Sequence, residues 1–205
     1  MKKFLLSLIV LLASVLTPLA TSAASAEQVL DKTAQNLLAS GSMTVRFKFT
    51  GSAGSGAGTI TMSGNYFYFD TPQLCIWYNG THQWVLQKSE DEVSLTKPSA
   101  SEILESNPFA LISKHKQFFA AKMQPSGAGK FKILLSPRRK GSYISSATVT
   151  VDAGTYLPTR IEFSTSDRNA SSVIITSTAK GKALPASYFT YNPKKYPQYE
   201  LIDLR

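Results

Sequence analysis

Four short apolar and aromatic runs follow one another between Gly58 and Leu86, and turn-forming residues separate each run from the next. The runs are Thr59–Met62, Tyr66–Phe69, Leu74–Tyr78 and Gln83–Leu86, and the turns are Ser63-Gly64-Asn65, Asp70-Thr71-Pro72 and Asn79-Gly80. Short runs of this composition, joined by tight turns, are typical of successive antiparallel strands. The stretch therefore predicts a sheet with a strongly apolar face, which serves either as a core or as a binding surface for an apolar ligand.

Residues 1–26 have the layout of a secretory signal peptide. Lys2 and Lys3 form the positive end, Phe4–Leu16 is the apolar run, and Ala24-Ser25-Ala26 is a small-residue cleavage site. Because the apolar run is shorter than the roughly 20 residues that span a bilayer, we expect cleavage near Ala26 rather than a retained anchor. The expected mature protein is residues 27–205, which are exported.

Charge and cysteine content narrow the range of functions. The only cysteine, Cys75, cannot form an internal disulfide, so the fold must depend on its core. Once the two lysines of the signal are removed, 20 Lys and Arg remain against 13 Asp and Glu. This excess favours contact with anionic surfaces such as lipid headgroups, or simply keeps the protein in solution. Nucleic acid is not expected as a partner, because the chain has no basic aromatic motif.

Two helices are predicted among many strands. Glu27–Ser40 has apolar residues at helical spacing and is followed by Gly41 as a C-cap, while Asn107-Pro108 starts a second, apolar helix that runs to about Met123. Gly51–Gly58 is predicted to be a flexible hairpin loop, because its glycines and serines have no core-forming side chains. Further strands are predicted at Met43–Thr50, Glu92–Lys97, Phe131–Leu135, Tyr143–Asp152, Leu157–Ser164, Ser172–Thr178 and Tyr188–Tyr191.

About eleven short strands in one unbroken run favour a large antiparallel sheet, a sandwich or a barrel. We expect a mainly β fold in which a single curved sheet carries the two helices on its concave, hydrophobic face. No linker divides the mature chain, so residues 27–205 are predicted to be one domain.

No cluster of side chains supports catalysis or metal binding. His82 and His115 have no second ligand at metal spacing and are predicted to be surface residues. Cys75 lies between two apolar residues without a basic partner and is predicted to be a small strand residue. The chain has no G-x-S-x-G elbow, phosphate loop or H-E-x-x-H motif. We therefore expect neither an enzyme nor a metal or cofactor site.

The order of four features resembles the LolA family of periplasmic lipoprotein carriers, especially its divergent LolA-like members. An amphipathic helix follows the signal, Asn79-Gly80-Thr81-His82-Gln83-Trp84 matches the family's Asp-Gly-x-x-x-Trp, and a closing segment spans Phe189–Arg205. Asn107-Pro108-Phe109-Ala110-Leu111-Ile112 is similar to the family's Pro-Phe-x-Leu-Leu helix start. The resemblance covers essentially the whole mature chain.

This resemblance implies an incomplete antiparallel β-barrel of about eleven strands, lidded by helices, with a hydrophobic cavity for lipoprotein acyl chains. It implies a monomeric periplasmic carrier that collects lipoproteins from an inner-membrane transporter and delivers them to an outer-membrane acceptor. Contact with the membrane would be peripheral or transient. One feature departs from the family: Ser63, Gly64 and Asn65 stand where members commonly have a Lys-Arg-Pro-like segment. The arginine associated with closing the lid is therefore not carried over.

Alternation along each strand places about half of its side chains on the concave face. Phe67 and Phe69 are chosen over Tyr66 and Tyr68 because a phenolic hydroxyl needs water or a partner, although alternation alone leaves this choice open. The candidates for the acyl-chain cavity are Val45, Phe47, Phe49, Ile60, Met62, Phe67, Phe69, Ile76, Tyr78, Trp84 and Leu86 from the sheet, and Phe109, Leu111 and Ile112 from the second helix.

Two functions from different classes remain open. The first is a soluble carrier of lipoprotein acyl chains. The second is a periplasmic sensor or scaffold on the same half-barrel fold, whose concave surface docks a protein partner. An enclosed apolar cavity would favour the carrier, whereas a filled interior with an exposed apolar patch outside would favour the scaffold. An envelope enzyme has the least support.

Overall fold

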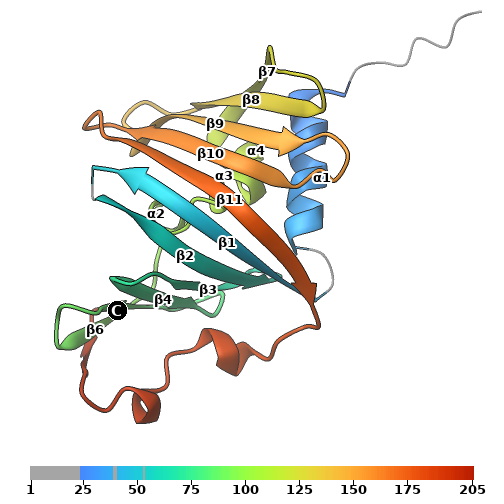
Figure 1. The fold of residues 1–205 in the computed structure, drawn as a ribbon. Helices are drawn as coiled ribbons and strands as arrows, with labels where there is room; N and C mark the ends of the chain where they lie inside the picture. Colours follow the sequence, from blue (N-terminus) through green and yellow to red (C-terminus); the bar gives the residue numbers. More distant parts are fainter. Residues whose placement is uncertain (1–23, 39–40, 53) are drawn as a thin grey trace, which may run out of the picture.

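The computed structural model describes residues 24–38, 41–52 and 54–205, and these residues form one twelve-stranded sheet (Figure 1). The predicted signal peptide lies outside the described residues up to residue 23. The strands are β1 (Ser42–Gly51), β2 (Gly54–Ser63), β3 (Tyr66–Asp70), β4 (Leu74–Tyr78), β5 (Gln83–Gln87), β6 (Glu92–Thr96), β7 (Phe119–Gln124), β8 (Lys130–Pro137), β9 (Ile144–Asp152), β10 (Pro158–Thr165), β11 (Ala170–Gly181) and β12 (Glu200–Asp203).

The strands lie in the order β12-β6-β5-β4-β3-β2-β1-β11-β10-β9-β8-β7, and the sheet curves without closing. Neighbouring strands are antiparallel except for β12, which runs parallel to β6. β1 and β11 join the two halves, because β1 pairs with β2 on one side and β11 on the other. This arrangement confirms the predicted incomplete antiparallel barrel, with one strand more than expected.

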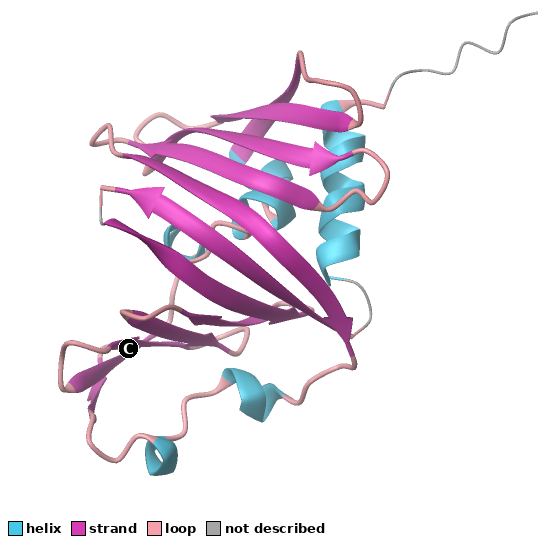
Figure 2. Cartoon of the chain, viewed as in Figure 1, coloured by secondary structure: helices cyan, strands magenta, loops and turns pink. Residues whose placement is uncertain are grey.

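Four helices lie on the concave face (Figure 2). They are α1 (Ala26–Leu38), α2 (Ala100–Ser106), α3 (Ala110–Ser113) and α4 (His115–Phe118). Val29, Leu30 and Leu37 form the buried face of α1, as their helical spacing predicts. Ser99 and Glu102 form a capping box that starts α2. None of the described helices is long and apolar enough to cross a membrane.

Three predicted elements are wrong. The second helix does not continue to Met123, because Phe119, Ala121 and Met123 alternate with outward residues and pair with β8 as strand β7. Gly54–Gly58 is not loop but the first half of β2, since its backbone stays paired with β1 up to Gly51. The strand expected at Tyr188–Tyr191 is absent from the described residues, where the 3₁₀ turn η1 (Ala186–Phe189) begins this segment.

The last segment of the chain crosses the convex face of the sheet. Residues 182–199, here called the C-terminal strap, include η1 and η2 (Pro193–Lys195) and run beneath β3 to β6 before β12 joins the edge (Figure 1). Tyr191 and Tyr196 of the strap each meet Trp77 edge-on, with ring centroids 5.5 and 5.4 Å apart. The strap therefore buries a second apolar cluster on the face opposite the helices.

Candidate functional site

A groove of about 390 Å³ opens on the concave face where β1, β2, β3 and β11 approach the loop after α2. Its apolar lining consists of Phe47, Phe49, Phe69, Leu74, Ile76, Pro108, Phe163 and Val173. Thr71, Gln73, Glu105 and Ser106 add polar groups at its rim. The volume falls within the range of small-molecule sites, about 300–1,000 Å³, near its lower end.

Three inward glycines of β2 lie at or beneath the groove, and of these Gly54 lines it directly. The inward positions of β2, every second residue from Met62 back, are Met62, Ile60, Gly58, Gly56 and Gly54. Met62 and Ile60 are buried in the core, whereas Gly54, Gly56 and Gly58, here called the glycine stripe, contribute no side chain. The groove is thus the part of the concave face where β2 has no side chains to fill it.

Aromatic rings lie over two of these glycines. A Cβ atom on Gly56 would lie 2.9 Å from Cζ of Phe49, and one on Gly58 would lie 2.8 Å from Cζ of Phe47 and 2.7 Å from the carbonyl oxygen of Asp70. Phe47 also stacks on Phe69, with ring centroids 5.3 Å apart. The floor of the groove is therefore a layer of phenyl rings set directly on backbone.

A second depression adjoins the groove and extends it toward β5 and β6. It has a volume of about 570 Å³ and shares Leu74, Ile76, Glu105 and Ser106 with the groove. Val85 and Leu204 add apolar surface to it, and Lys97 and Arg205 lie at its rim. The two together form an open trough along α2, which is mainly apolar in the groove and mixed in this extension, where Gln83, Thr96 and Glu102 also line it.

Most of the predicted cavity residues are packed core rather than open lining. Those that line the groove are Phe47, Phe49, Phe69 and Ile76. Those that fill the interior between the sheet and the helices are Val45, Ile60, Met62, Phe67, Tyr78, Phe109, Leu111 and Ile112. Of this second set, Met62, Phe67, Tyr78 and Phe109 also border a smaller cavity of about 150 Å³ near the end of α1.

Trp84 and Leu86 are not part of the concave face, which corrects their assignment to the cavity. Trp84 pairs with Trp77 and Leu86 with Cys75, and all four side chains belong to the cluster beneath the C-terminal strap. Because adjacent residues of a strand face opposite sides, the inward residue of β5 is Val85. The sequence pattern of Gln83–Leu86 is compatible with either orientation, because Trp84 and Leu86 on one face and Val85 on the other are all apolar.

The groove also contains residues that the sequence did not single out. Leu74, Phe163 and Val173 lie in predicted strands, and each falls on the inward parity of its strand. Alternation within Leu157–Ser164 and Ser172–Thr178 was the available signal, but nothing in the sequence placed these strands beside the glycine stripe.

Acidic and basic side chains connect α1 to α4 on the same face. Asp31 of α1 accepts from Lys116 Nζ at 2.8 Å, and its other oxygen lies 3.7 Å from Nε2 of His115. His115 Nδ1 lies 2.8 Å from the carbonyl oxygen of Ile112 and therefore donates to it. His115 is buried, so its prediction as a surface residue is wrong. At the end of β2, Ser63 Oγ donates to the carbonyl oxygen of Gly41.

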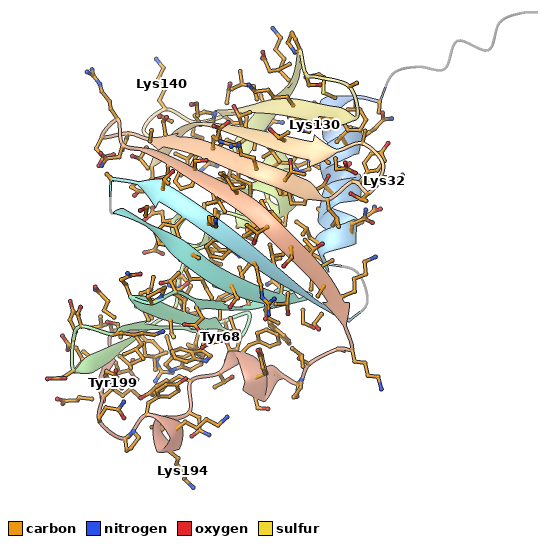
Figure 3. All side chains as sticks on the ribbon, in the orientation of Figure 1. Lys32, Tyr68, Lys130, Lys140, Lys194 and Tyr199 are labelled. Carbon is orange, nitrogen blue, oxygen red and sulfur yellow. The ribbon has the colours of Figure 1, made fainter. Side chains whose placement is uncertain are left out.

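A further polar cluster surrounds Cys75 on the side of the strap, and its Asp70 is partly exposed and pairs with Lys88 Nζ at 2.8 Å. Cys75 Sγ is 3.2 Å from Asp70 Oδ1 and 3.6 Å from the Tyr68 hydroxyl, and burial raises the pKa of both the thiol and the phenol. Figure 3 shows Tyr68 on the side of the sheet that faces the strap. Within residues 24–38, 41–52 and 54–205, no three His, Cys, Asp or Glu side chains gather as metal ligands.

The sequence matches the family model described as outer membrane lipoprotein carrier protein LolA over residues 16–167. No curated protein matches the sequence.

Several solved structures are similar at low sequence identity. An uncharacterized conserved protein from Thermus thermophilus is 10% identical, covers 87% of this chain and 98% of its own, and has a TM-score of 0.58. A LolA superfamily protein from Nitrosomonas europaea is 14% identical over 82% of this chain and 99% of its own, with a TM-score of 0.48. MucA/MucB from Pseudomonas aeruginosa matches at 11% identity over 82% of this chain and 62% of that chain, with a TM-score of 0.43. The Thermus likeness shows a shared fold.

Proposed function

Because the chain belongs to the family of the outer membrane lipoprotein carrier protein LolA, we propose that it is an exported carrier that shelters lipoprotein acyl chains in the groove. The observation that carries this proposal is the glycine stripe, which leaves an apolar, ring-floored space open on the concave face. The cargo would be taken from an inner-membrane transporter and delivered to an outer-membrane acceptor, as in the family.

The chemistry of the lining suits an acyl chain. Each methylene removed from water contributes roughly 0.8 kcal/mol, so a chain that enters the trough gains affinity without polar contacts. Rings and aliphatic side chains provide most of the exposed lining of the groove, and Thr50, Ser55, Ser171 and Ser172 add small polar groups to it. A site without specific hydrogen bonds also releases its ligand readily to a second apolar site, which a carrier requires.

The filled interior supports a second candidate. Phe109, Leu111 and Ile112 are buried against the sheet, so the centre of the half-barrel is occupied by the protein's own side chains. This packing favours the scaffold function, in which the trough binds an apolar segment of a protein partner.

Binding of a triacylated lipopeptide distinguishes the two functions. The mature protein is titrated by calorimetry with the triacylated peptide and with the same peptide lacking acyl chains, and native mass spectrometry records any co-purified lipid. The carrier function predicts binding of the triacylated form alone. Equal binding of both peptides, or binding of neither, contradicts it, and equal binding supports the scaffold.

A further inference from the structure

The convex face of the sheet is divided into a covered half and an open half. The C-terminal strap runs under β3 to β6, and helices α1 to α4 lie on the concave side (Figures 1 and 2). The convex face of the other strands, β1, β11, β10, β9, β8 and β7, is therefore in contact with solvent. This open half is separate from the groove, which lies on the other side of the sheet.

Basic residues that are scattered in the sequence meet on this open half. Arg46 and Lys48 alternate with the buried Val45 and Phe47 of β1, so they point outward. Alternation assigns the same side to Lys122 of β7, Lys132 of β8 and Arg160 of β10, because at least one neighbour of each along its strand belongs to the core or packs against it. We call these five residues, Arg46, Lys48, Lys122, Lys132 and Arg160, the basic face.

The register of the sheet sets three of them in one row. Lys132 pairs with Thr150, Thr150 with Arg160, Arg160 with Ile174, and Ile174 with Lys48. Neighbouring strands are about 4.8 Å apart, so successive charges of the row are about 10 Å apart and the row spans about 20 Å. This spacing is close to the Debye length at physiological ionic strength, so the charges act together on one anionic surface.

Little negative charge opposes them. On the outward face of the described strands β1 and β7 to β11 there are two acidic side chains: Glu162, which lies 3.3 Å from Arg160, and Asp152, which ends β9 opposite Lys130. Lys48, Lys122 and Lys132 are exposed, and so is Lys130, which extends from β8 (Figure 3). Ile174 lies inside the row and is 38% exposed, which adds an apolar contact.

We propose that the basic face docks the protein onto a bilayer surface that carries anionic headgroups. Long, flexible cationic side chains spread over several strands suit a broad field of negative charge better than a single bound anion. Docking through the convex face leaves the groove and the helices on the solvent side, where cargo and partner proteins can reach them.

Vesicle flotation with the mature protein tests this surface. Vesicles of phosphatidylcholine alone are compared with vesicles that also contain phosphatidylglycerol, at low and at physiological ionic strength. One variant carries Lys48→Gln, Lys122→Gln and Lys132→Gln. The matched control carries Lys182→Gln, Lys194→Gln and Lys195→Gln, which removes the same charge from exposed positions of the strap. Circular dichroism verifies that both variants are folded.

We expect wild type and the control to bind the anionic vesicles, and the basic-face variant to bind about 100-fold more weakly, since each lysine contributes about fivefold. Equal losses in the two triple variants would overturn the assignment to this face. Wild type that does not prefer anionic over neutral vesicles would overturn membrane docking itself. Binding of wild type to polyglutamate but to no vesicle would also overturn it, and would make an acidic protein the partner. Acyl binding in the groove is measured separately, so failure of one proposal does not affect the other.

Discussion

Replacing Gly56 with leucine should fill the groove from its floor. Gly56 is on the inward side of β2, and its new Cβ would lie 2.9 Å from Cζ of Phe49, which lines the groove and is only half-buried. The ring must therefore turn toward the open space, and the leucine side chain occupies the place of about four methylene groups of a ligand. At roughly 0.8 kcal/mol for each methylene, affinity for an acyl chain falls by about 3 kcal/mol, or about 100-fold.

The matched control is Ala57→Leu on the same strand. Ala57 pairs with Lys48 and is exposed on the convex face, so the same side chain is added outside the groove. Affinity for a triacylated lipopeptide is measured by fluorescence displacement, and thermal unfolding shows whether each variant retains its fold. Gly56→Ala, a smaller change, should give an intermediate loss. If folded Gly56→Leu binds as tightly as Ala57→Leu, the groove is not the binding site and the reasoning is wrong.

Three further predictions concern the fold. The thiol of Cys75 is buried beneath the strap and has a raised pKa, so maleimide should label it slowly in the folded protein. Labelling should be faster in Tyr191→Ala, which removes a ring of the strap. Equal labelling rates in the two proteins would show that the strap does not protect the thiol. Hydrogen bonds from the Thr155 backbone N–H and hydroxyl lower the pKa of Asp152 in the folded protein. The ionised carboxylate therefore contributes its full share of folding stability above the unfolded pKa of about 3.9, and this contribution is lost as the pH falls through the lower folded pKa. Asp152→Asn should therefore melt below wild type at pH 7, and the difference should vanish in acid; a constant difference would contradict the linkage. Ser25 Oγ accepts from the backbone N–H of Gln28, and Gln28 Oε1 accepts from the backbone N–H of Ser25, so the two residues cap the start of α1. In differential scanning calorimetry, a protein that begins at Ser25 should therefore melt about 2–4 °C above one that begins at Glu27. Identical melting temperatures would show that this cap does not stabilise the fold.

The element types followed from the sequence wherever one periodicity dominated. α1 and the strands β1 and β3 to β6 were predicted within a few residues, because their apolar residues recur at a single period and their turns contain Gly, Asn or Pro. The second helix was predicted too long because Phe118-Phe119 is apolar in either conformation. The pairing of Phe119–Gln124 with β8 decides that residue 119 starts a strand, and this long-range contact is invisible in the local sequence.

Which face an apolar residue occupies was less predictable. Phe67 and Phe69 point toward the helices, while Tyr66 and Tyr68 lie on the side of the strap. The phenol argument therefore selected the right pair, and the hydroxyl of the half-buried Tyr68 lies 3.6 Å from Cys75 Sγ. For Trp84 the sequence offered no such criterion, because the strap supplies an apolar environment on the convex face that no local pattern indicates.

The glycine stripe explains why the location of the groove was missed. A strand whose inward side chains are all large leaves no space for a ligand, because those side chains fill the volume between the sheet and the helices. Val45, Ile60 and Phe109 fill the interior of this protein in that way. Binding space requires inward positions without side chains, and β2 provides them at Gly54, Gly56 and Gly58. In the sequence these glycines indicate a loop, because glycine lacks strand propensity; in the sheet, the pairing with β1 holds them extended. The groove thus opens where the alternation is interrupted at Gly54–Gly58, and the inward residues Phe69, Leu74 and Ile76 of the aromatic runs that follow form its neighbouring wall.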